Sequence, residues 1–185
     1  TDQNLTVSSG TISVDNANLL NATTTGTVTA AIDLTEDVDE LTTLSGTGAY
    51  TIVIASGDAT GSTAAEFNTI NSATTVAIDA SNVTALASSD LSDVKTLLTA
   101  ANDTDQFTDS TGKVSFGGLT AVAITDSTVN VSDFNAAVTQ ANTATGKTTA
   151  ANSGGATVFI LASAATYSGG TCLLYTSDAA DERHC

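Results

Sequence analysis

The stretch LTVSSGTISVDNAN, residues 5–18, decides the fold because the chain repeats it. A second copy, VAITDSTVNVSDFN, occupies residues 122–135, and a looser copy, EFNTINSATTVAID, occupies residues 66–79. Each copy combines an apolar alternation, a turn rich in Ser, Thr, Asp and Gly, a capping residue and a short run with helical spacing. One such unit cannot bury its apolar face alone, so neighbouring units must stack. The repeats therefore predict an elongated structural or binding protein.

Strand candidates follow one another at an even spacing. Alternating β-branched residues mark six segments, at residues 5–8, 27–32, 50–55, 75–79, 121–125 and 157–162. The centres of the first four segments are separated by 21, 25 and 24 residues, at Val7, Val28, Val53 and Ala77. This spacing is typical of a leucine-rich-repeat unit, which carries one strand and one helix.

Short helices are expected between these strands. Thr35 precedes Val38 and Leu41, and Thr63 with Glu66 has the spacing of a capping box. Two further runs have apolar residues at helical intervals: Leu91, Val94, Leu97 and Leu98 after Ser89 or Asp90, and Phe134, Ala137, Val138 and Ala141 after Ser132. Strands joined by helical crossovers favour parallel pairing with right-handed connections.

The predicted fold class is therefore α/β: a parallel β/α solenoid with leucine-rich-repeat-like coils of about 24 residues. It spans residues 1–171, with coils near 5–26, 27–49, 50–74, 75–118, 119–156 and 157–171. The step from Ala77 to Ala123 is about two coils long, and we interpret the polar segment 102–118 as an insertion. The Gly- and Asn-containing segment 144–155 is interpreted as a loop.

The C-terminal segment is set apart from the repeats. Residues 172–182, CLLYTSDAADE, resemble the translation of a transposase-based sequencing adapter, so we expect residues 172–185 to be a non-biological tail. Both cysteines, the only histidine and the only arginine lie in this tail. The repeats therefore contain no residues for a disulfide, a zinc site or a Cys–His catalytic pair. Because the chain starts at Thr1 and contains no Met, we expect an internal piece of a longer reading frame.

The charge of the chain excludes two classes of partner. A net charge of −16 repels nucleic acid and anionic membrane surfaces and attracts cations. No apolar run approaches the roughly 20 residues that a membrane span requires. The longest, TVFILASAA at residues 157–165, is interpreted as a buried strand. We expect neither nucleic-acid binding nor membrane insertion.

Three segments carry a family resemblance. DNANLLNATTTGTV (15–28), EFNTINSATTVAIDAS (66–81) and VNVSDFNAAV (129–138) resemble the tandem D-L-N-T-L-D…T-T-G-T-V-D-A repeats of very large surface or secreted proteins of marine bacteria, cyanobacteria included. The resemblance spans most of residues 5–150. It implies an extracellular, non-enzymatic repeat region attached to calcium-binding or adhesive modules elsewhere. The chain departs from the pattern at Val76, where the Gly of T-T-G belongs.

Three aspartates each follow an apolar strand: Asp33, Asp79 and Asp126. Stacked coils would place their carboxylates in a column along one edge, and carboxylate oxygens are ligands that calcium prefers. The alternative, which we favour, is that each Asp closes an Asx-turn to its own backbone.

The segment NDTDQFTDSTG offers a second set of carboxylates, Asp103, Asp105 and Asp109, as candidate calcium ligands. An EF-hand loop needs Asp or Asn where Phe107 stands, then Gly and a terminal Glu, so we favour a solvated loop. An acidic cluster, Glu36, Asp37, Asp39 and Glu40, suits the first turns of a helix, or alternatively a glycosidase acid–base pair. A threonine run could present hydroxyls to polysaccharide or ice, although β-propensity explains it equally well: Thr23, Thr24, Thr25, Thr27 and Thr29.

These observations predict a non-catalytic stalk or spacer in an adhesin-like protein of the bacterial cell surface or extracellular space. Its partners would be surface glycans or neighbouring repeats of the same protein, with calcium as the one candidate cofactor. The alternative is a glycan- or calcium-binding extracellular module, recognising glycan through the exposed sheet face or the 102–118 segment. A β-helix polysaccharide-degrading enzyme is a more distant alternative.

Overall fold

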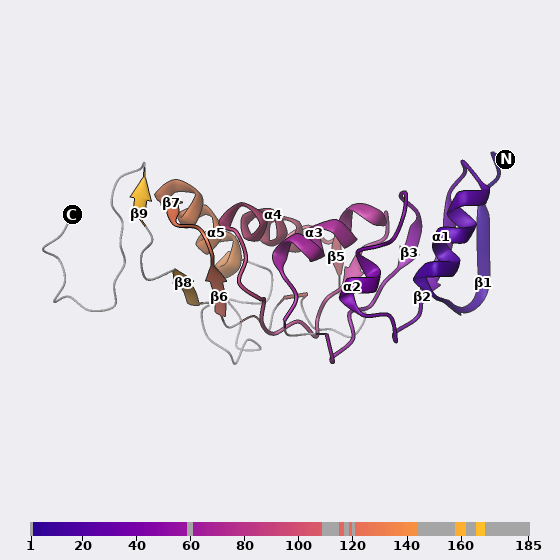
Figure 1. Cartoon of the computed structure of the whole chain (residues 1–185), viewed down its shortest axis with the longest axis horizontal. Helices are drawn as coiled ribbons and strands as arrows, with labels where there is room; N and C mark the ends of the chain where they lie inside the picture. Colours follow the sequence, from indigo (N-terminus) through magenta and orange to yellow (C-terminus); the bar gives the residue numbers. More distant parts are fainter. Residues whose placement is uncertain are drawn as a thin grey trace, which may run out of the picture.

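The computed structural model describes residues 2–58, 61–108, 115–116, 119, 121–143, 158–161 and 166–168. Most elements follow one another along the long axis of the molecule, starting from the N-terminus at one end (Figure 1). The strands are β1 (Leu5–Ile12), β2 (Val28–Ile32), β3 (Ala49–Thr51), β4 (Ile78–Asp79), β5 (Phe107–Thr108), β6 (Ala121–Ile124), β7 (Thr128–Asn130), β8 (Val158–Leu161) and β9 (Thr166–Ser168). The helices are α1 (Val14–Thr23), α2 (Val38–Leu41), α3 (Ala64–Ala73), α4 (Leu91–Ala101) and α5 (Val131–Thr143).

Every strand pairing within the described residues is parallel. The order β1-β2-β3 forms one sheet, and β4 pairs with β5, β6 with β8, and β7 with β9. Single parallel bridges add three contacts: Gly48 with Thr74, Val53 with Asp79, and Ser89 with Ile124. The protein is thus a mixed α/β fold of small parallel sheets and helices, and no barrel closes among the residues placed here. The expected α/β class and parallel pairing are confirmed.

The distance along the chain between register partners increases toward the C-terminus. It is 23 residues for Leu5 and Val28 and 29 for Ile78 and Phe107. It reaches 37 for Ala121 and Val158. The predicted spacing of 21 to 25 residues therefore fits the first units, and the later units are longer.

The segment predicted to be an insertion, 102–118, contains part of the core. Its strand β5 pairs with β4, and Phe107 and Phe116 are both almost fully buried. The Phe116 ring makes edge-to-face contacts with Phe67 and Phe107, with centroids 5.3 and 5.2 Å apart. The expectation of a solvated loop is wrong for these residues, because two aromatic side chains anchor the segment in the core.

Apolar side chains from strands and helices form one continuous core. Val28 and Ile32 of β2, Ile52 just after β3 and Ile78 of β4 belong to this core, and all are at most 4 % exposed. Each helix turns one apolar stripe toward these strands, which is why short helices persist here. The buried helix positions include Ala17, Ala64, Phe67, Ile70, Val94, Leu97, Leu98, Ala137 and Ala141.

Side-chain caps fix where the helices begin. The predicted capping box of Thr63 and Glu66 is confirmed. Thr35 does not cap α2, because its amide and hydroxyl both bond to Asp33, and the capping box is formed by Asp37 with Glu40. Ser132 is not a cap either. Helix α5 starts one residue earlier, and the side chain of Asn130 accepts from the amides of Ser132 and Asp133.

Two threonines make similar hydrogen bonds to backbone far back in the chain. Thr24 follows α1 and Thr74 follows α3, each as an extended C-cap residue. The Thr74 hydroxyl donates to the Tyr50 carbonyl (2.7 Å) and accepts from the Tyr50 amide (3.0 Å). The Thr24 hydroxyl likewise donates to the Gln3 carbonyl, 21 residues earlier in the chain. Each threonine side chain thus bonds to backbone 21 or 24 residues earlier in the chain.

Candidate functional site

The carboxylates expected to form a column are each used within the fold. Asp33 accepts from the amide and the hydroxyl of Thr35 (3.0 and 3.1 Å) and from the Thr11 hydroxyl (3.1 Å). These hydrogen bonds, the Thr35 amide first, lower the pKa of Asp33. Asp79 is buried and accepts from the Ser81 amide (3.0 Å). Asp33 and Asp79 therefore close Asx-turns with the residue two positions later.

The register separates Asp33 from Asp79. Ala31 pairs with Thr51, so the same register carried two residues further places Val53 opposite Asp33, and Val53 itself pairs with Asp79. Two strand spacings amount to about 9.6 Å, which is too far for one calcium ion with ligands at about 2.4 Å. Asp126 lies between β6 and β7, and its carboxylate accepts a hydrogen bond from the backbone amide of Leu91 at the start of α4 (2.6 Å).

The second set of candidate ligands is only partly described. One Asp103 carboxylate oxygen accepts from the Asp105 amide (3.0 Å), and the other accepts from the Gln106 side chain (2.9 Å). These bonds, the one from Gln106 first, lower the pKa of Asp103. Asp109 lies outside the described residues. Among the residues that the structure does place, no three His, Cys, Asp or Glu side chains gather closely enough to hold a metal ion.

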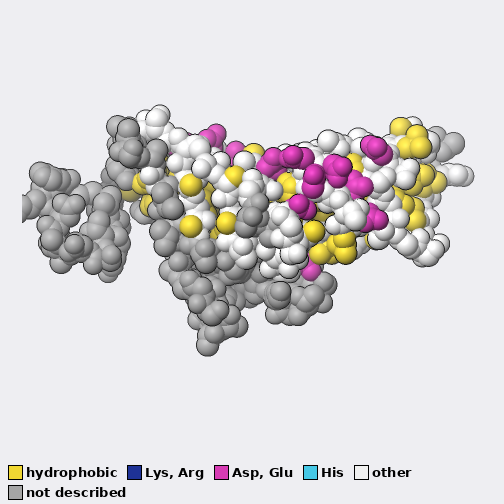
Figure 2. Space-filling model, turned by 60° about the horizontal axis from the view of Figure 1, so that its bottom comes forward, with side chains coloured by type: hydrophobic (Ala, Val, Ile, Leu, Met, Phe, Trp, Pro, Cys, Tyr) yellow, Lys and Arg dark blue, Asp and Glu magenta, His cyan; other side chains and the backbone are white. Residues whose placement is uncertain are grey.

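The acidic cluster includes a member that the sequence did not indicate. Burial raises the pKa of Asp58, and the Asp37 and Glu40 carboxylates raise it further. Asp37 accepts from the Glu40 amide (2.8 Å), and Glu40 accepts from the Asp37 amide (3.0 Å). Figure 2 shows Asp and Glu side chains gathered in a band on one face of the molecule. Because Asp37 and Glu40 cap a helix, helix capping explains this pair without catalysis.

A groove of about 690 Å³ lies along α4, between α3 and the β7–α5 segment. Most of its lining side chains carry a hydroxyl or an amide. The lining residues are Asn68, Asn71, Ser72, Leu91, Ser92, Lys95, Thr96, Thr99, Ala100, Gln106, Asp126, Thr128, Asn130 and Asp133. Several of these groups bond within the protein: the Asn68 amide and the Thr96 and Thr99 hydroxyls donate to backbone carbonyls.

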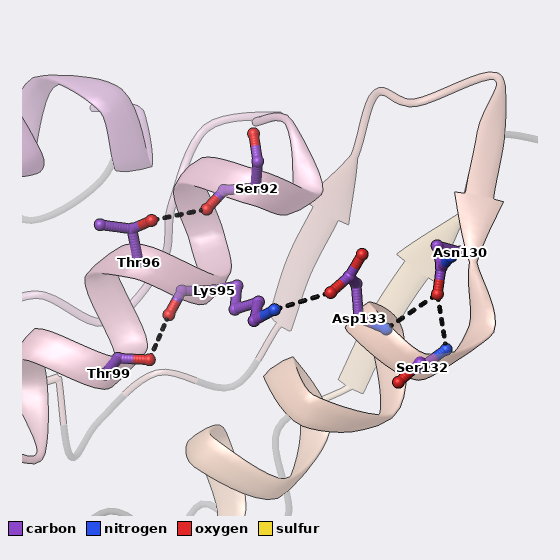
Figure 3. Close-up of polar contacts among 7 residues, drawn as sticks. All are labelled: Ser92, Lys95, Thr96, Thr99, Asn130, Ser132 and Asp133. Carbon is purple, nitrogen blue, oxygen red and sulfur yellow. Dashed lines mark hydrogen bonds and ion pairs between the residues drawn. The ribbon is translucent and has the colours of Figure 1, made fainter. Parts of the chain in front are cut away.

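An ion pair crosses one wall of this groove. Lys95 of α4 reaches Asp133 of α5 at 2.6 Å, and both side chains are about half exposed, at 42 % and 49 % (Figure 3). The Thr96 and Thr99 hydroxyls on the same helix face donate to backbone carbonyls of α4, at 2.9 and 2.8 Å. An exposed pair of this kind contributes at most about 1 kcal/mol. It joins two helices rather than marking a reactive centre.

Asparagine side chains connect successive units. Asn18 and Asn68 hold the same place in the repeat, six residues before Thr24 and Thr74. Asn18 donates to the Thr43 carbonyl and Asn68 to the Asp93 carbonyl, each at 3.0 Å and each 25 residues further along. Both Asn side chains therefore bond to backbone 25 residues further along the chain. Sequence reasoning missed this role, although the shared Asn-to-Thr spacing was visible.

Comparison with protein-family models, curated proteins and solved structures finds no match to this chain. Within the described ranges, no helix has both the length and the apolarity needed to cross a membrane.

Proposed function

We propose that the chain is a structural stalk or spacer, a parallel β/α solenoid within a large surface-exposed or secreted bacterial protein. The observation that carries this proposal is the recurrence of one set of contacts between neighbouring units. Asn18 and Asn68 each bond 25 residues forward. Thr24 and Thr74 bond 21 and 24 residues back. Repeat residues selected for contact with the next unit are what a stacked array requires.

Stacked units suit a spacer because each contacts chiefly its neighbours. Stability then accumulates unit by unit, and the length of the array can change without redesign of a global core. The net charge of −16 keeps such a rod soluble and discourages lateral association. The resemblance to giant marine bacterial repeat proteins supports placement at the cell surface or outside the cell.

The test is mechanical. We would tether the whole chain at both termini and stretch it with optical tweezers. A stalk built from stacked units unfolds in a series of steps, each releasing one unit. A unit of 24 residues, the Tyr50-to-Thr74 separation, releases roughly 80 Å of contour. Release of the folded chain in one cooperative step would contradict the proposal, because a single global core unfolds as one unit.

A second candidate, a glycan-binding module, is favoured by the groove along α4. Its hydroxyl and amide lining suits sugar hydroxyls, although no aromatic side chain lines it for stacking against a sugar ring. Calorimetric titration with cellohexaose, a neutral oligosaccharide, tests this function. Saturable binding that Ser92→Tyr abolishes and Ser45→Tyr preserves would support it, because Ser92 lines the groove and Ser45 does not. If millimolar cellohexaose produced no heat of binding, the glycan-binding function would be ruled out.

A further inference from the structure

The chain contains five Asn-X-Ser/Thr tripeptides, the acceptor sequence for attachment of a sugar to an asparagine side chain. In a chain this rich in Ser and Thr, such tripeptides also arise by chance, so the sequence alone does not select one of them. The five asparagines are Asn4, Asn21, Asn82, Asn102 and Asn130. The sugar is joined to the amide nitrogen, Nδ2, so that atom must be accessible and not already used by the fold.

Three of the five asparagines use the amide nitrogen within the fold or pack it against backbone. The Nδ2 atoms of Asn82 and Asn102 donate to backbone carbonyls, at 2.9 and 3.0 Å. Asn21 lies within α1, and a Cβ added at Gly46 would lie 2.5 Å from its Nδ2 atom, so the loop after α2 already covers that atom. A sugar on any of these three atoms would displace a contact of the folded chain.

Asn4 is exposed, but its tripeptide is bound to the neighbouring part of the sheet. The Oδ1 atom of Asn4 accepts from the Thr27 amide (2.9 Å), and the Leu5 amide donates to the Thr27 carbonyl (2.9 Å). Side chain and backbone are therefore both attached to the residue that precedes β2. A transferase would have to detach this tripeptide from the sheet before it could act on Asn4.

Asn130 is the exposed last residue of β7, where the chain leaves the strand and enters α5. Its Oδ1 atom accepts from the backbone amides of Ser132 (2.9 Å) and Asp133 (3.2 Å) (Figure 3). Only the oxygen of the side-chain amide can accept these bonds, so Nδ2 lies on the other side of the group, away from the two donors. No hydrogen bond from this nitrogen is found within the part of the chain that the structure describes.

The surroundings of Asn130 also suit a sugar. Ser132, which supplies the hydroxyl of the tripeptide, is exposed, and its amide bond to Asn130 keeps the two residues in one turn. Asn130 lines the groove along α4, so open space lies beside the side chain. The hydrogen bonds to Oδ1 stabilise the amide after it has lost an Nδ2 proton, because the negative charge then resides largely on oxygen.

We propose that Asn130 is an acceptor for N-linked glycosylation, with a hexose carried on a nucleoside diphosphate as the donor. Nδ2 attacks the anomeric carbon of the hexose, the nitrogen–carbon bond forms, and the bond from that carbon to the phosphate oxygen breaks. The nucleoside diphosphate leaves with the bonding electrons, and one Nδ2 proton passes to a base of the transferase. Oδ1 keeps both of its hydrogen bonds, so the start of α5 stays capped. The proposal does not depend on the stalk function, since transfer requires only the folded tripeptide.

The test incubates the folded full chain with UDP-glucose and a soluble glucosyltransferase that accepts Asn-X-Ser/Thr. Intact mass gives the number of sugars added, and peptide mass spectrometry gives their positions. We expect the mass of a single hexose, located at Asn130. A protease digest of the same chain, in which all five tripeptides are accessible, shows that the enzyme is active. An unmodified folded chain, or transfer to Asn4 or another asparagine in place of Asn130, would overturn the proposal.

Three variants separate the tripeptide from the rest of the chain. Asn130→Gln should abolish transfer, and Asn4→Gln, the same substitution at the other exposed tripeptide, should leave the rate unchanged. Ser132→Ala keeps the backbone amide that bonds to Asn130 and removes only the hydroxyl, so it should lower the rate at least about tenfold. An unchanged melting temperature shows that the Ser132→Ala chain is folded. Equal transfer rates for Ser132→Ala and the unsubstituted chain would contradict recognition of the tripeptide.

Discussion

The threonine contacts between units lead to the sharpest stability prediction, Thr74→Val. Valine keeps the shape of threonine, so the substitution removes a hydroxyl and leaves no cavity. That hydroxyl bonds to the amide and the carbonyl of Tyr50, at 3.0 and 2.7 Å, and to the Val76 amide at 3.1 Å. Tyr50 is 0 % exposed, so water cannot replace the lost partner there. A buried polar group without a partner costs about 1–3 kcal/mol, so we expect a loss of about 2–5 kcal/mol.

The assay is urea denaturation of the full chain, followed by circular dichroism, with stability read from the midpoint at an unchanged slope. Thr96→Val is the matched control, because the Thr96 hydroxyl is exposed and bonds within its own helix to the Ser92 carbonyl. It should change stability by less than about 0.5 kcal/mol. Equal effects of the two substitutions would refute the idea that Thr74 joins the units.

Three further predictions concern other positions. Gly48→Ala should destabilise the fold by about 1–3 kcal/mol in thermal unfolding, because the new Cβ would lie 2.5 Å from the Tyr50 ring and 2.9 Å from the Val28 carbonyl oxygen. Gly57→Ala, which meets nothing within 4 Å, is the control and should be neutral or slightly stabilising. Asp58→Asn should raise the melting temperature slightly at neutral pH, because burial and the nearby carboxylates raise the pKa of Asp58 and so penalise its charged form in the folded state. The gain should vanish below the ordinary pKa of 3.8, where Asp58 is protonated in both states, and a gain that persists in acid would contradict this cause. Millimolar calcium should leave the melting temperature unchanged, since Asp33 and Asp79 close turns; a rise that Asp79→Ala abolishes would restore the carboxylate column.

The sequence predicts the strands that have clear alternation and a β-branched core face. All six predicted segments overlap observed strands, and the capping box at Thr63 and Glu66 is present. Strand β5 was missed because two residues, Phe107 and Thr108, carry no periodicity; Phe107 alone of the two is buried, in the aromatic cluster. Strand β7 was missed for a related reason, because its three residues merge into the start of α5.

The contacts between units were harder to predict than the elements. Thr24 and Thr74 fit the general β-propensity of threonine, and their partners lie 21 and 24 residues away. The favoured prediction that aspartates after strands close turns is confirmed at Asp33 and Asp79. It could be made from sequence because an Asx-turn is a local interaction. Long-range partners depend on the register between units, which periodicity alone does not supply. Equal spacing of Asn and Thr in two copies was the available signal.

Parallel stacking of successive units is the central claim, and nuclear Overhauser contacts between backbone protons test it most directly. We predict amide-to-α-proton contacts between register partners in neighbouring units, at Ala30 with Tyr50, Val53 with Asp79, and Ile78 with Phe107. Close contacts between α-protons across these strands would instead indicate antiparallel pairing and would contradict the account.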